Sequence, residues 1–575
     1  METKLTSGSG TGTTYPDMDN FGRPTTWDWW RSGGGGAAFY DVDITYDQNS
    51  NPTSTTDNIH VRNSSGNRLF DVLYGLDNLN RVISADEGTL SGTISNRTSK
   101  ETWALSQTGN WTGNTVDTNG DGTNEYNFNS TTFNKANEWT ARTNSMGSYT
   151  ENMTYDANGN MTQWGYREGD GQRYTYTYDA FGRLMKVQTD IGAGAHDHTK
   201  YRYNGLGFRI AWQYDTDASQ TLTDSERYYF MYDERWRIVG TFRNTDDYAK
   251  ESFVYHAAGK AGRGDASYID SVILRDRDTT NGWTGNPDGS LEERRFYCQN
   301  WRADVVAITN SNGLPYEFVR YTSYGKAQVF AAADVNRDGI VNATDADDWD
   351  DLYSENPSGA AIPVDFNFDG SSFDPTDTDD FNALYSAQSG FSNALQLSSL
   401  GNRKGYAGYE FDQAIEAYHV RHRVYLPEIG RWTKRDPAGY VDGVSLYEYA
   451  KAMILAANDS TGLYWVLNCR FYFPAFELSA TIQSYSLSGT CRNFSDREFR
   501  RGFNKTSGDG IKKYCENTQP DNIKCESPYQ CQQMGPVEVI EHTQTHTITV
   551  REGSCTVTAN VVAHCKWRTQ GGRCQ

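Results

Sequence analysis

The chain has 575 residues and a formal net charge of −21, which argues against nucleic acid as the partner of the repeat region or of the whole chain. Hydrophobic residues make up only 37%, but 14% of the residues are aromatic, with 38 Tyr, and Gly reaches 54. A disordered chain is therefore excluded, and this composition favours extended β structure with many turns. No apolar run approaches the ~18 residues that a transmembrane helix needs.

Residues 1–38 form a polar, glycine-rich N-terminal segment. Its start, Met1–Gly12, lacks the apolar core of a signal peptide, so no export signal is visible. The cysteine-rich end of the chain nevertheless predicts an oxidising compartment. We therefore expect a secreted or cell-surface protein of bacterial type that has either lost its natural start or uses a dedicated export machine.

A Tyr that is followed by Asp and a turn recurs from Phe39 to about Lys260. From Tyr155 onward the repeats are spaced by 23, 25, 29 and 23 residues, which indicates a repeat with loops of varying length. Within 174–178, Tyr alternates with Thr, so the rings share one face of a strand, while Asp179 and Gly182 supply the turn. Each unit is predicted to be two short strands and a turn, and the units must stack because a lone hairpin is marginal in water.

These units resemble the repeats of the YD-repeat, or RHS, family, most closely in Tyr-Asp-Ala-Phe-Gly-Arg-Leu at 178–184 and Tyr-Asp-Ala-Asn-Gly-Asn-Met at 155–161. Residues 400–463 resemble the RHS repeat-associated core through Gly430-Arg431-Trp432, Arg435-Asp436-Pro437 and Leu446-Tyr447-Glu448-Tyr449. The resemblance implies a mostly β fold. Repeats over 39–330 would form a curled antiparallel β-sheet shell, and the core would close one end of it.

An acidic insert at residues 331–390 interrupts the pattern. The stretch Asp334–Asp345 has the spacing of a calcium-binding loop, with Gly339 at the sixth position for the sharp turn. Residues 334–388 of the insert contain 14 acidic side chains and only one Arg. So many negative charges would repel one another unless a cation were bound. The ligands expected for Ca²⁺ in this first loop are Asp334, Asn336, Asp338, Ile340, Asn342 and Asp345.

A second copy follows 31 residues later, with one extra residue that shifts its last two ligands. The pair resembles a dockerin-type duplicated calcium module, in which each loop leads into a short helix, here expected at 346–353 and 378–387. Because the insert lies inside the RHS pattern, we expect a structural role and leave open whether it binds a cohesin. The competing interpretation is a solvated acidic loop. The expected ligands of the second loop are Asp365, Asn367, Asp369, Ser371, Asp374 and Asp377.

A third stretch, 117–122, also begins like a calcium loop. Its twelfth position is Phe128, which offers no ligand. A plain turn is the competing interpretation.

The end of the core carries residues for self-cleavage. In RHS proteins an aspartyl-type reaction releases the C-terminal segment after a Leu, and the matching positions here are Asp436, Asp459 and Leu463. Such chemistry needs two adjacent carboxylates, one to activate water and one to protonate the carbonyl oxygen. Arg435 is expected to orient a carboxylate, and the alternative is that it is simply an exposed ion-pair partner. Ser460 stands where the family usually has Pro, so the alternative is that both Asp residues only cap turns.

Residues 464–575 differ in kind from the rest of the chain. They hold 13 Lys and Arg against 10 Asp and Glu, and a disulfide-rich domain is expected from their cysteines. His542 and His546 are four residues apart in a predicted strand. In a strand this spacing does not indicate that the two side chains bind the same metal ion. No multiple-turnover activity can be identified there. The cysteines concerned are Cys469, Cys491, Cys515, Cys525, Cys531, Cys555, Cys565 and Cys574.

The sequence therefore supports two hypotheses of different class. In the first, an RHS shell and core present or enclose the protein's own C-terminal polypeptide, a toxin candidate released by self-cleavage after Leu463. In the second, a calcium-stabilised surface protein adheres to neighbouring cells or surface carbohydrate, and its C-terminal module is never released.

Overall fold

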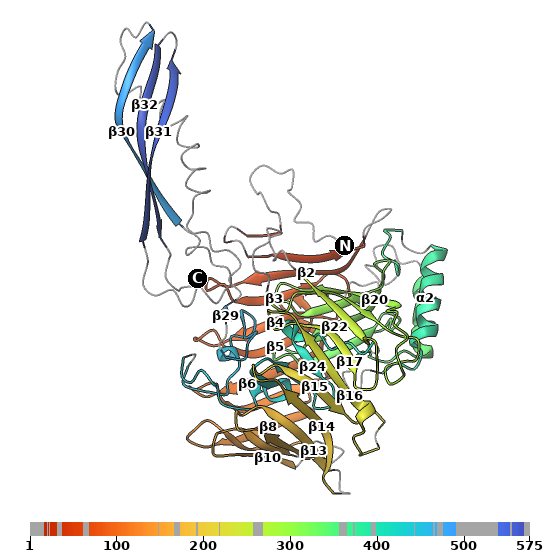
Figure 1. The fold of residues 1–575 in the computed structure, drawn as a ribbon. Helices are drawn as coiled ribbons and strands as arrows, with labels where there is room; N and C mark the ends of the chain where they lie inside the picture. Colours follow the sequence, from red (N-terminus) through yellow and green to blue (C-terminus); the bar gives the residue numbers. More distant parts are fainter. Residues whose placement is uncertain are drawn as a thin grey trace. The chain divides into compact units, whose positions relative to one another are not determined.

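The chain divides into two compact units, Met1–Asn468 and Cys469–Gln575, in the computed structural model (Figure 1). The structure describes residues 17–463, 466–467, 475–489, 539–552 and 555–568. Within the first range it leaves out 20, 22, 32–36, 61–67, 148, 166–172, 191–193, 218, 257–267, 356–364, 372–373, 393–397, 399 and 442. In this described part no helix is long and apolar enough to span a membrane.

The larger unit is dominated by one 23-stranded sheet, in which every strand pairs antiparallel with the next strand of the sequence. Figure 1 shows successive strands from β2 to β10 following one another down the unit. The strands are β1 (Thr26–Trp30), β2 (Ala38–Tyr46), β3 (Pro52–Asp57), β4 (Asp71–Leu76), β5 (Val82–Ser91), β6 (Thr93–Leu105), β7 (Trp111–Asp117), β8 (Tyr126–Phe133), β9 (Trp139–Asn144), β10 (Tyr149–Tyr155), β11 (Met161–Gly165), β12 (Arg173–Tyr178), β13 (Leu184–Asp190), β14 (His196–Tyr203), β15 (Arg209–Tyr214), β16 (Arg227–Tyr232), β17 (Ile238–Arg243), β18 (Glu251–Tyr255), β19 (Val272–Arg277), β20 (Glu293–Gln299), β21 (Val305–Thr309), β22 (Pro315–Tyr321) and β23 (Ala327–Ala331).

The prediction of a mostly β protein with a large antiparallel sheet is confirmed, and the sheet begins earlier than expected. Strand β1 lies within residues 1–38, which the sequence assigned to a polar segment before the repeats. Its Trp27 and Trp29 both donate a side-chain hydrogen bond to the carbonyl of Gln299 on β20. Three Trp residues in five positions are the signal for this strand, since aromatic residues favour strands.

The Asp of each repeat builds the turn of its hairpin. Between β12 and β13, Asp179 Oδ1 accepts hydrogen bonds from the backbone N–H groups of Phe181 and Arg183, each at 2.9 Å. Gly182 takes a left-handed φ of 68°, which costs glycine little. An Asp or Asn acceptor followed three residues later by a positive φ recurs in turns that begin at Asp77, Asn134, Asp156, Asn204, Asp233, Asn300 and Asn310.

The repeated Tyr joins one hairpin to the hairpin before it. The hydroxyl of Tyr203 donates to the carbonyl of Leu184 at 2.9 Å, and Tyr232 does the same to Arg209 at 2.9 Å. The rings of Tyr174 and Tyr176 are buried on one face of β12, as their alternation with Thr predicts. In the Tyr-Asp pair, the Tyr therefore links two hairpins and the Asp closes a turn.

The sheet curls, so that its last strands lie against its first strands. Arg320 on β22 donates to Glu87 on β5 at 2.7 Å. The rings of Phe70, just before β4, and Phe330 on β23 have centroids 5.6 Å apart. These contacts join segments that are more than two hundred residues apart in sequence.

Residues 400–463 pack into the hydrophobic cluster that the repeat strands form. Their aromatic side chains, including Tyr418, Tyr425, Trp432 and Tyr449, are fully buried in that cluster. They make their own antiparallel sheet of four short strands: β24 (Glu410–Asp412), β25 (Ala417–Val420), β26 (Arg423–Leu426) and β27 (Arg431–Trp432). We call residues 400–463 the core segment.

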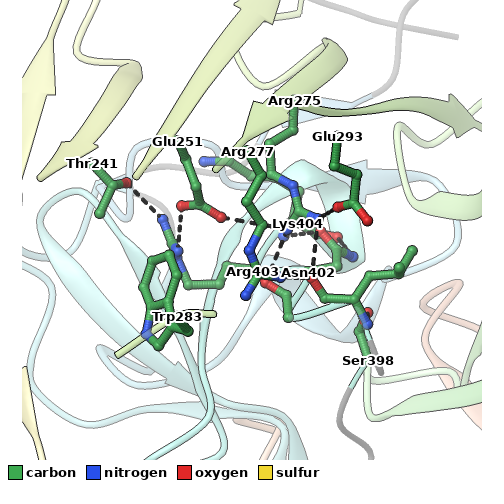
Figure 2. A network of polar contacts seen from close by, with 12 residues as sticks. Thr241, Glu251, Arg275, Arg277, Trp283, Glu293, Ser398, Asn402, Arg403 and Lys404 are labelled. Atoms are coloured by element: carbon green, nitrogen blue, oxygen red, sulfur yellow. Dashed lines mark hydrogen bonds and ion pairs between the residues drawn. The ribbon is translucent and has the colours of Figure 1, made fainter. Parts of the chain in front are cut away.

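A buried network of charges fixes the start of the core segment to the sheet. Arg403 lies 2.7 Å from Glu251 on β18 and 2.8 Å from Glu410, and donates to Thr241 on β17 at 3.0 Å. Lys404 lies 2.7 Å from the other oxygen of Glu410. Figure 2 shows Arg403 between Thr241 and Glu251, with the Trp283 ring beside it. Because these groups are buried, removing one partner would leave an uncompensated charge.

The insert contributes the two helices that the sequence predicts, each a few residues longer than expected. They are α1 (Ala343–Glu355) and α2 (Pro375–Gln388). The smaller unit has a three-stranded antiparallel sheet in the order β30 (Ala475–Gly489), β32 (Cys555–Arg568) and β31 (Val539–Glu552). Cys555 and Cys565 lie on β32, and His542 and His546 lie on β31. The other six cysteines of this unit, and with them the predicted disulfides, lie outside the described residues.

Candidate functional site

The candidate cleavage site lies where the core segment crosses the turns of the repeats. The backbone N–H of Met161 donates to the carbonyl of Thr433 at 2.7 Å, and Asn160 and Lys434 form an antiparallel bridge. Lys434 Nζ donates to the carbonyl of Gly182, in the next repeat turn, at 2.8 Å. Successive repeat turns therefore support the chain that leads into Asp436.

The structure brings Asp436 and Asp459 together on one arginine. Arg423 Nη2 lies 2.9 Å from Asp436 Oδ2 and 2.8 Å from Asp459 Oδ2. All three residues are nearly inaccessible to solvent. The Nε–H of Arg423 also donates to the carbonyl of Gly462, one residue before Leu463. A single guanidinium group thus holds both carboxylates and the backbone beside the predicted cleavage point.

Asp459 builds the turn that carries Leu463. Its Oδ1 accepts from the backbone N–H groups of Gly462 at 2.8 Å and Leu463 at 3.2 Å. Gly462 has a φ of 70°, and a Cβ there would lie 2.6 Å from the carbonyl oxygen of Val420, so the position requires glycine. The carboxylate of Asp459 therefore contacts the backbone N–H of Leu463, the residue whose carbonyl the predicted reaction would attack.

The environment of Asp436 raises the pKa of its carboxyl above the ordinary value. Burial raises the pKa of this carboxyl, the neighbouring Arg423 opposes the rise, and the nearby charge of Asp459 adds to it. Its Oδ1 accepts from the backbone N–H of Ala438 at 2.7 Å. A carboxyl that retains its proton more readily than usual is suited to donate that proton to a reacting group.

A small pocket adjoins the two carboxylates. Asp436, Asp459 and Arg423 line it together with Ser445 and Glu448. Its volume is enough for about one water molecule. Ser445 Oγ and Glu448 Oε1 are buried there, and among the described residues they have no hydrogen-bond partner. The pocket therefore combines two carboxylates with polar atoms that a water molecule would satisfy.

Arg435 does not join this group, although the sequence assigned it the task of orienting a carboxylate. Its guanidinium lies 2.6 Å from Glu138 and donates to the hydroxyl of Tyr447 at 3.2 Å. Arg423 occupies the expected position instead. The signal for Arg423 is an arginine at an inward position of strand β26, between Val420 and Tyr425, which are both buried.

Ser460, which replaces the usual Pro, is buried within the turn. Its carbonyl accepts a hydrogen bond from Arg421, whose guanidinium also lies 2.7 Å from Asp270. The turn is therefore fixed from outside even without a proline. Tyr464, on the other side of the predicted cut, lies outside the described residues.

The chain forms a short ladder across the predicted cut. Strand β28 (Ala457–Asn458), before Leu463, pairs antiparallel with β29 (Val466–Leu467), after it. The ladder contains two residue pairs, Ala457 with Leu467 and Asn458 with Val466.

The first insert loop folds around its acidic side chains. Asp334 accepts from the N–H groups of Asp338 at 3.1 Å and Gly339 at 2.9 Å. Asp345, at the twelfth position, accepts from Val335 at 2.8 Å and from Asn342 at 2.9 Å. The N–H groups of Asp338 and Ile340 donate to the loop residues Asn336 and Asp338, respectively.

The second loop repeats this arrangement despite its extra residue. Asp365 accepts from Asp369 and Gly370, each at 2.9 Å, and Asn367 accepts from Asp369 at 3.0 Å. Asp377 takes the place that Asp345 has in the first loop, since it accepts from the N–H of Asn367. Two expected ligands also contact the starts of the helices, because Asn342 accepts from the N–H of Thr344 near the start of α1 and Asp374 caps α2. Within the loop, the N–H of Ser371 donates to Asp369.

The donors in both loops fit a calcium ion. Burial raises the pKa of Asp334 to about 7 and that of Asp377 to about 6. Asp345 and Asp365 have raised pKa values for the same reason. Carboxylates collected in this way are disfavoured in their charged form unless a cation joins them. Oxygen donors at this spacing are the ligands that Ca²⁺ prefers.

Two further acidic groups could hold a cation. Asp117, Asp121 and Glu125 have carboxylate oxygens within 4.8 Å of one another, in the turn after β7 that the sequence singled out. Glu125, at the ninth position, joins this group where Phe128 cannot. The sequence reasoning missed the other group, and its signal is the spacing of acidic residues between β15 and β16. That group consists of Asp215, Asp217 and Glu226.

Comparison with known proteins gives a matching family model and distant relatives. The model of the RHS Repeat family matches residues 155–196. The tRNA3(Ser)-specific nuclease WapA of Bacillus spizizenii is 23% identical over 320 residues, which is 55% of this chain and 9% of the relative. Toxin subunit YenC2 of Yersinia entomophaga is 23% identical over 299 residues, which is 50% of this chain and 29% of the relative. The chain thus spans less than a third of either relative.

Among solved structures, the crystal structure of TcdB2-TccC3 is similar, with 18% identity and a TM-score of 0.45. The match covers 77% of this chain and 18% of that chain.

Proposed function

This chain carries RHS repeats, and we propose that it is a toxin-type carrier whose repeats and core segment hold the C-terminal polypeptide 464–575. In this proposal the polypeptide is freed by self-cleavage after Leu463. The observation that carries the proposal is the shared contact of Asp436 and Asp459 with Arg423, beside the turn that ends at Leu463.

The reaction would be a single hydrolysis within the chain. A water molecule in the pocket gives a proton to the carboxylate of Asp459, and its oxygen bonds to the carbonyl carbon of Leu463. Asp436 donates its proton to the carbonyl oxygen. The C–N bond to Tyr464 then breaks as Asp459 passes the proton it took from water to the nitrogen of Tyr464. One hydroxyl of the diol returns its proton to Asp436, which leaves the new carboxyl group on Leu463. Arg423 holds both carboxylates in place, so the chemistry requires no residue from outside the core segment.

The names of the relatives support a carrier with a toxic passenger. One relative is named as a toxin subunit and the other as a nuclease. Because the chain spans only a small part of each, the activity of residues 464–575 and their target are not inferred from these names. The eight cysteines of that region support a secreted or cell-surface location for the protein.

Intact-mass analysis of the purified protein tests the proposed cleavage. The wild-type chain should yield a fragment that ends at Leu463 and a second fragment that begins at Tyr464. Asp459→Asn should give only full-length chain, whereas Asp276→Asn, in an ion pair on β19, should cut like wild type. Full-length wild-type protein alone would contradict self-cleavage.

A second candidate function is a surface adhesion protein whose C-terminal module stays attached. One observation favours it: Asp459 Oδ1 is already occupied by the N–H groups of its own turn, as in a purely structural cap. An uncut chain that binds neighbouring cells or surface carbohydrate would support this function. Growth of cells that express the full chain, compared with cells that express a chain ending at Leu463, gives a second readout. Arrest that requires residues 464–575 would support the toxin.

We also propose that the two insert loops bind Ca²⁺. The support is the repeated inward arrangement of donors around Asp334 and Asp365. Isothermal titration of the full chain with calcium should show binding that Asp334→Asn and Asp365→Asn each weaken. Unchanged binding in the double variant would place the calcium elsewhere.

A further inference from the structure

The insert contacts both ends of the 23-stranded sheet. At the first end, the backbone N–H of Ala37 donates to the carbonyl of Phe368 at 3.1 Å. Arg31 donates to the carbonyl of Asn367, and the rings of Phe39 and Phe368 meet edge to face at 6.0 Å. These contacts hold the β1–β2 hairpin against the second insert loop.

At the other end, the insert contacts β22 and β23. Gln388, the last residue of α2, donates to the carbonyl of Tyr316 at 2.8 Å and accepts from the N–H of Ala333 at 3.0 Å. Arg337, in the first loop, donates to the carbonyl of Ala331 at 3.0 Å and lies over the ring of Phe318 at 4.8 Å. The insert therefore bridges the first hairpin and the last hairpin of the sheet.

The bridging residues occupy the same position in the two loops. Arg337 is the fourth residue of the first loop, and Phe368 is the fourth residue of the second. Both have left-handed backbones, with φ of 59° and 56°. Such a conformation is costly for a side chain with a Cβ and persists only where the surroundings impose it. Expected calcium ligands flank each of these two residues. Whether the residue contacts the sheet therefore depends on whether its loop is ordered.

Apolar packing connects the loops, the helices and both ends of the sheet. One buried cluster contains Trp349 of α1, Phe381 of α2 and Phe366 of the second loop, together with residues of the two sheet ends. The rings of Trp349 and Phe381 stack at 4.8 Å. The cluster members from the strands are Phe39, Cys298, Ala307, Phe318, Phe330 and Ala331, and Phe70 and Leu314 lie directly before strands β4 and β22. Disorder in the loops would expose part of this cluster.

We infer that the insert is a calcium-set clip that fastens the first hairpin of the sheet to the last. The inference rests on the proposed calcium binding and adds what the bound ion would control. Other contacts also join the two ends, among them Trp27 with Gln299 and Arg320 with Glu87. Calcium removal should therefore loosen the junction locally without unfolding the sheet.

Hydrogen exchange on the full chain, in excess calcium and in a chelator, tests the clip. Without calcium, the amides of Ala37 and Ala333 should exchange about tenfold faster, because their acceptors belong to the insert. The amides of Tyr176 and Val187, on β12 and β13 far from the insert in sequence, should be unchanged.

Phe368→Gly provides the matched variant. Glycine accepts the left-handed backbone and no expected ligand is altered, so calcium binding measured by titration should persist. The variant keeps the carbonyl that accepts from Ala37 but lacks the ring that packs against Phe39, so in calcium the Ala37 amide should exchange faster than in the wild-type chain. The clip is overturned if calcium binds and protects α1 and α2 while exchange at Ala37 and Ala333 is the same in both conditions. Absence of any calcium binding would instead overturn the calcium proposal itself.

Discussion

Gly430 lies so close to Trp111 that a Cβ at residue 430 would be 2.4 Å from the indole Cζ2. Gly430 begins the stretch of the core segment that crosses the repeat turns, and Trp111 opens β7 of the sheet. The two residues mark a close approach between the backbone of the core segment and a side chain of a repeat strand.

We predict that Gly430→Ala destabilises the protein more than Gly439→Ala. Both glycines have left-handed φ values, 60° and 74°, so both substitutions carry a backbone cost of about 1 kcal/mol. A Cβ at Gly439 meets no atom within 4 Å, whereas at Gly430 it must displace Trp111, at a further cost of about 1–3 kcal/mol. Urea unfolding of the two variants measures the difference. Equal midpoints would contradict the contact.

Arg403→Met should destabilise the protein by about 3–5 kcal/mol, because it leaves Glu251 and Glu410 buried with fewer partners. The control is Arg294→Gln on β20, whose ion pair with Asp276 is at the surface, since the Arg294 side chain is 53% exposed. That variant should change stability by about 0–1 kcal/mol. Urea unfolding at neutral pH provides both values, and a mild effect at Arg403 would argue against the buried network.

The same network should weaken in acid. Burial alone would raise the pKa of Glu410, but Lys404 and Arg403 together lower it to about 2. A carboxyl whose folded pKa is depressed stabilises the fold above its unfolded pKa, and this contribution is lost as the pH falls toward the folded value. Wild-type stability should therefore decline between about pH 4.5 and pH 2. In Arg403→Met the decline from this group should be smaller, which unfolding curves across this range would show.

Glu448→Gln should stabilise the protein in alkali and have little effect in acid. Burial raises the pKa of Glu448 to about 7, against the attraction of Arg431. A carboxyl whose pKa is higher in the folded state than in the unfolded state lowers the free energy of unfolding as the pH rises from the unfolded pKa to the folded pKa. Glutamine does not titrate and has no such effect. Melting temperatures at about pH 4 and about pH 8 should show a gain only at the higher pH. Glu234→Gln, at an exposed position, should show no gain at either pH.

Arg423→Lys should slow the proposed cleavage by about 100-fold, because a single ammonium group cannot hold both carboxylates and the Gly462 carbonyl in the same geometry. Intact-mass time courses measure the rate. Arg435→Lys should cut at close to the wild-type rate, since Arg435 contacts Glu138 and Tyr447 instead. The opposite order of the two variants would restore the role that the sequence assigned to Arg435.

The repeats could be predicted from the sequence because their chemistry is local. Asp179 closes its turn by accepting hydrogen bonds from the N–H groups of the residues two and four positions later. A short sequence motif is therefore enough to predict the turn. The insert loops are predictable for the same reason. Arg423 could not be assigned in this way, because its partner Asp459 is 36 residues away. The contact of Arg435 with Glu138 could not be predicted either, because Glu138 is 297 residues distant.

The two residue pairs of the ladder between β28 and β29 are contacts that a cut after Leu463 would leave in place. With two residue pairs, and a net worth of about 0.5–1.5 kcal/mol for each hydrogen bond, it is a weak tether. Before the cut, its partners are joined by a short stretch of chain and re-form whenever they part. After it, the backbone no longer rejoins them, so the ladder would add only a short delay to the separation of the two products. A substitution at Asn458 or Val466 would shorten that delay.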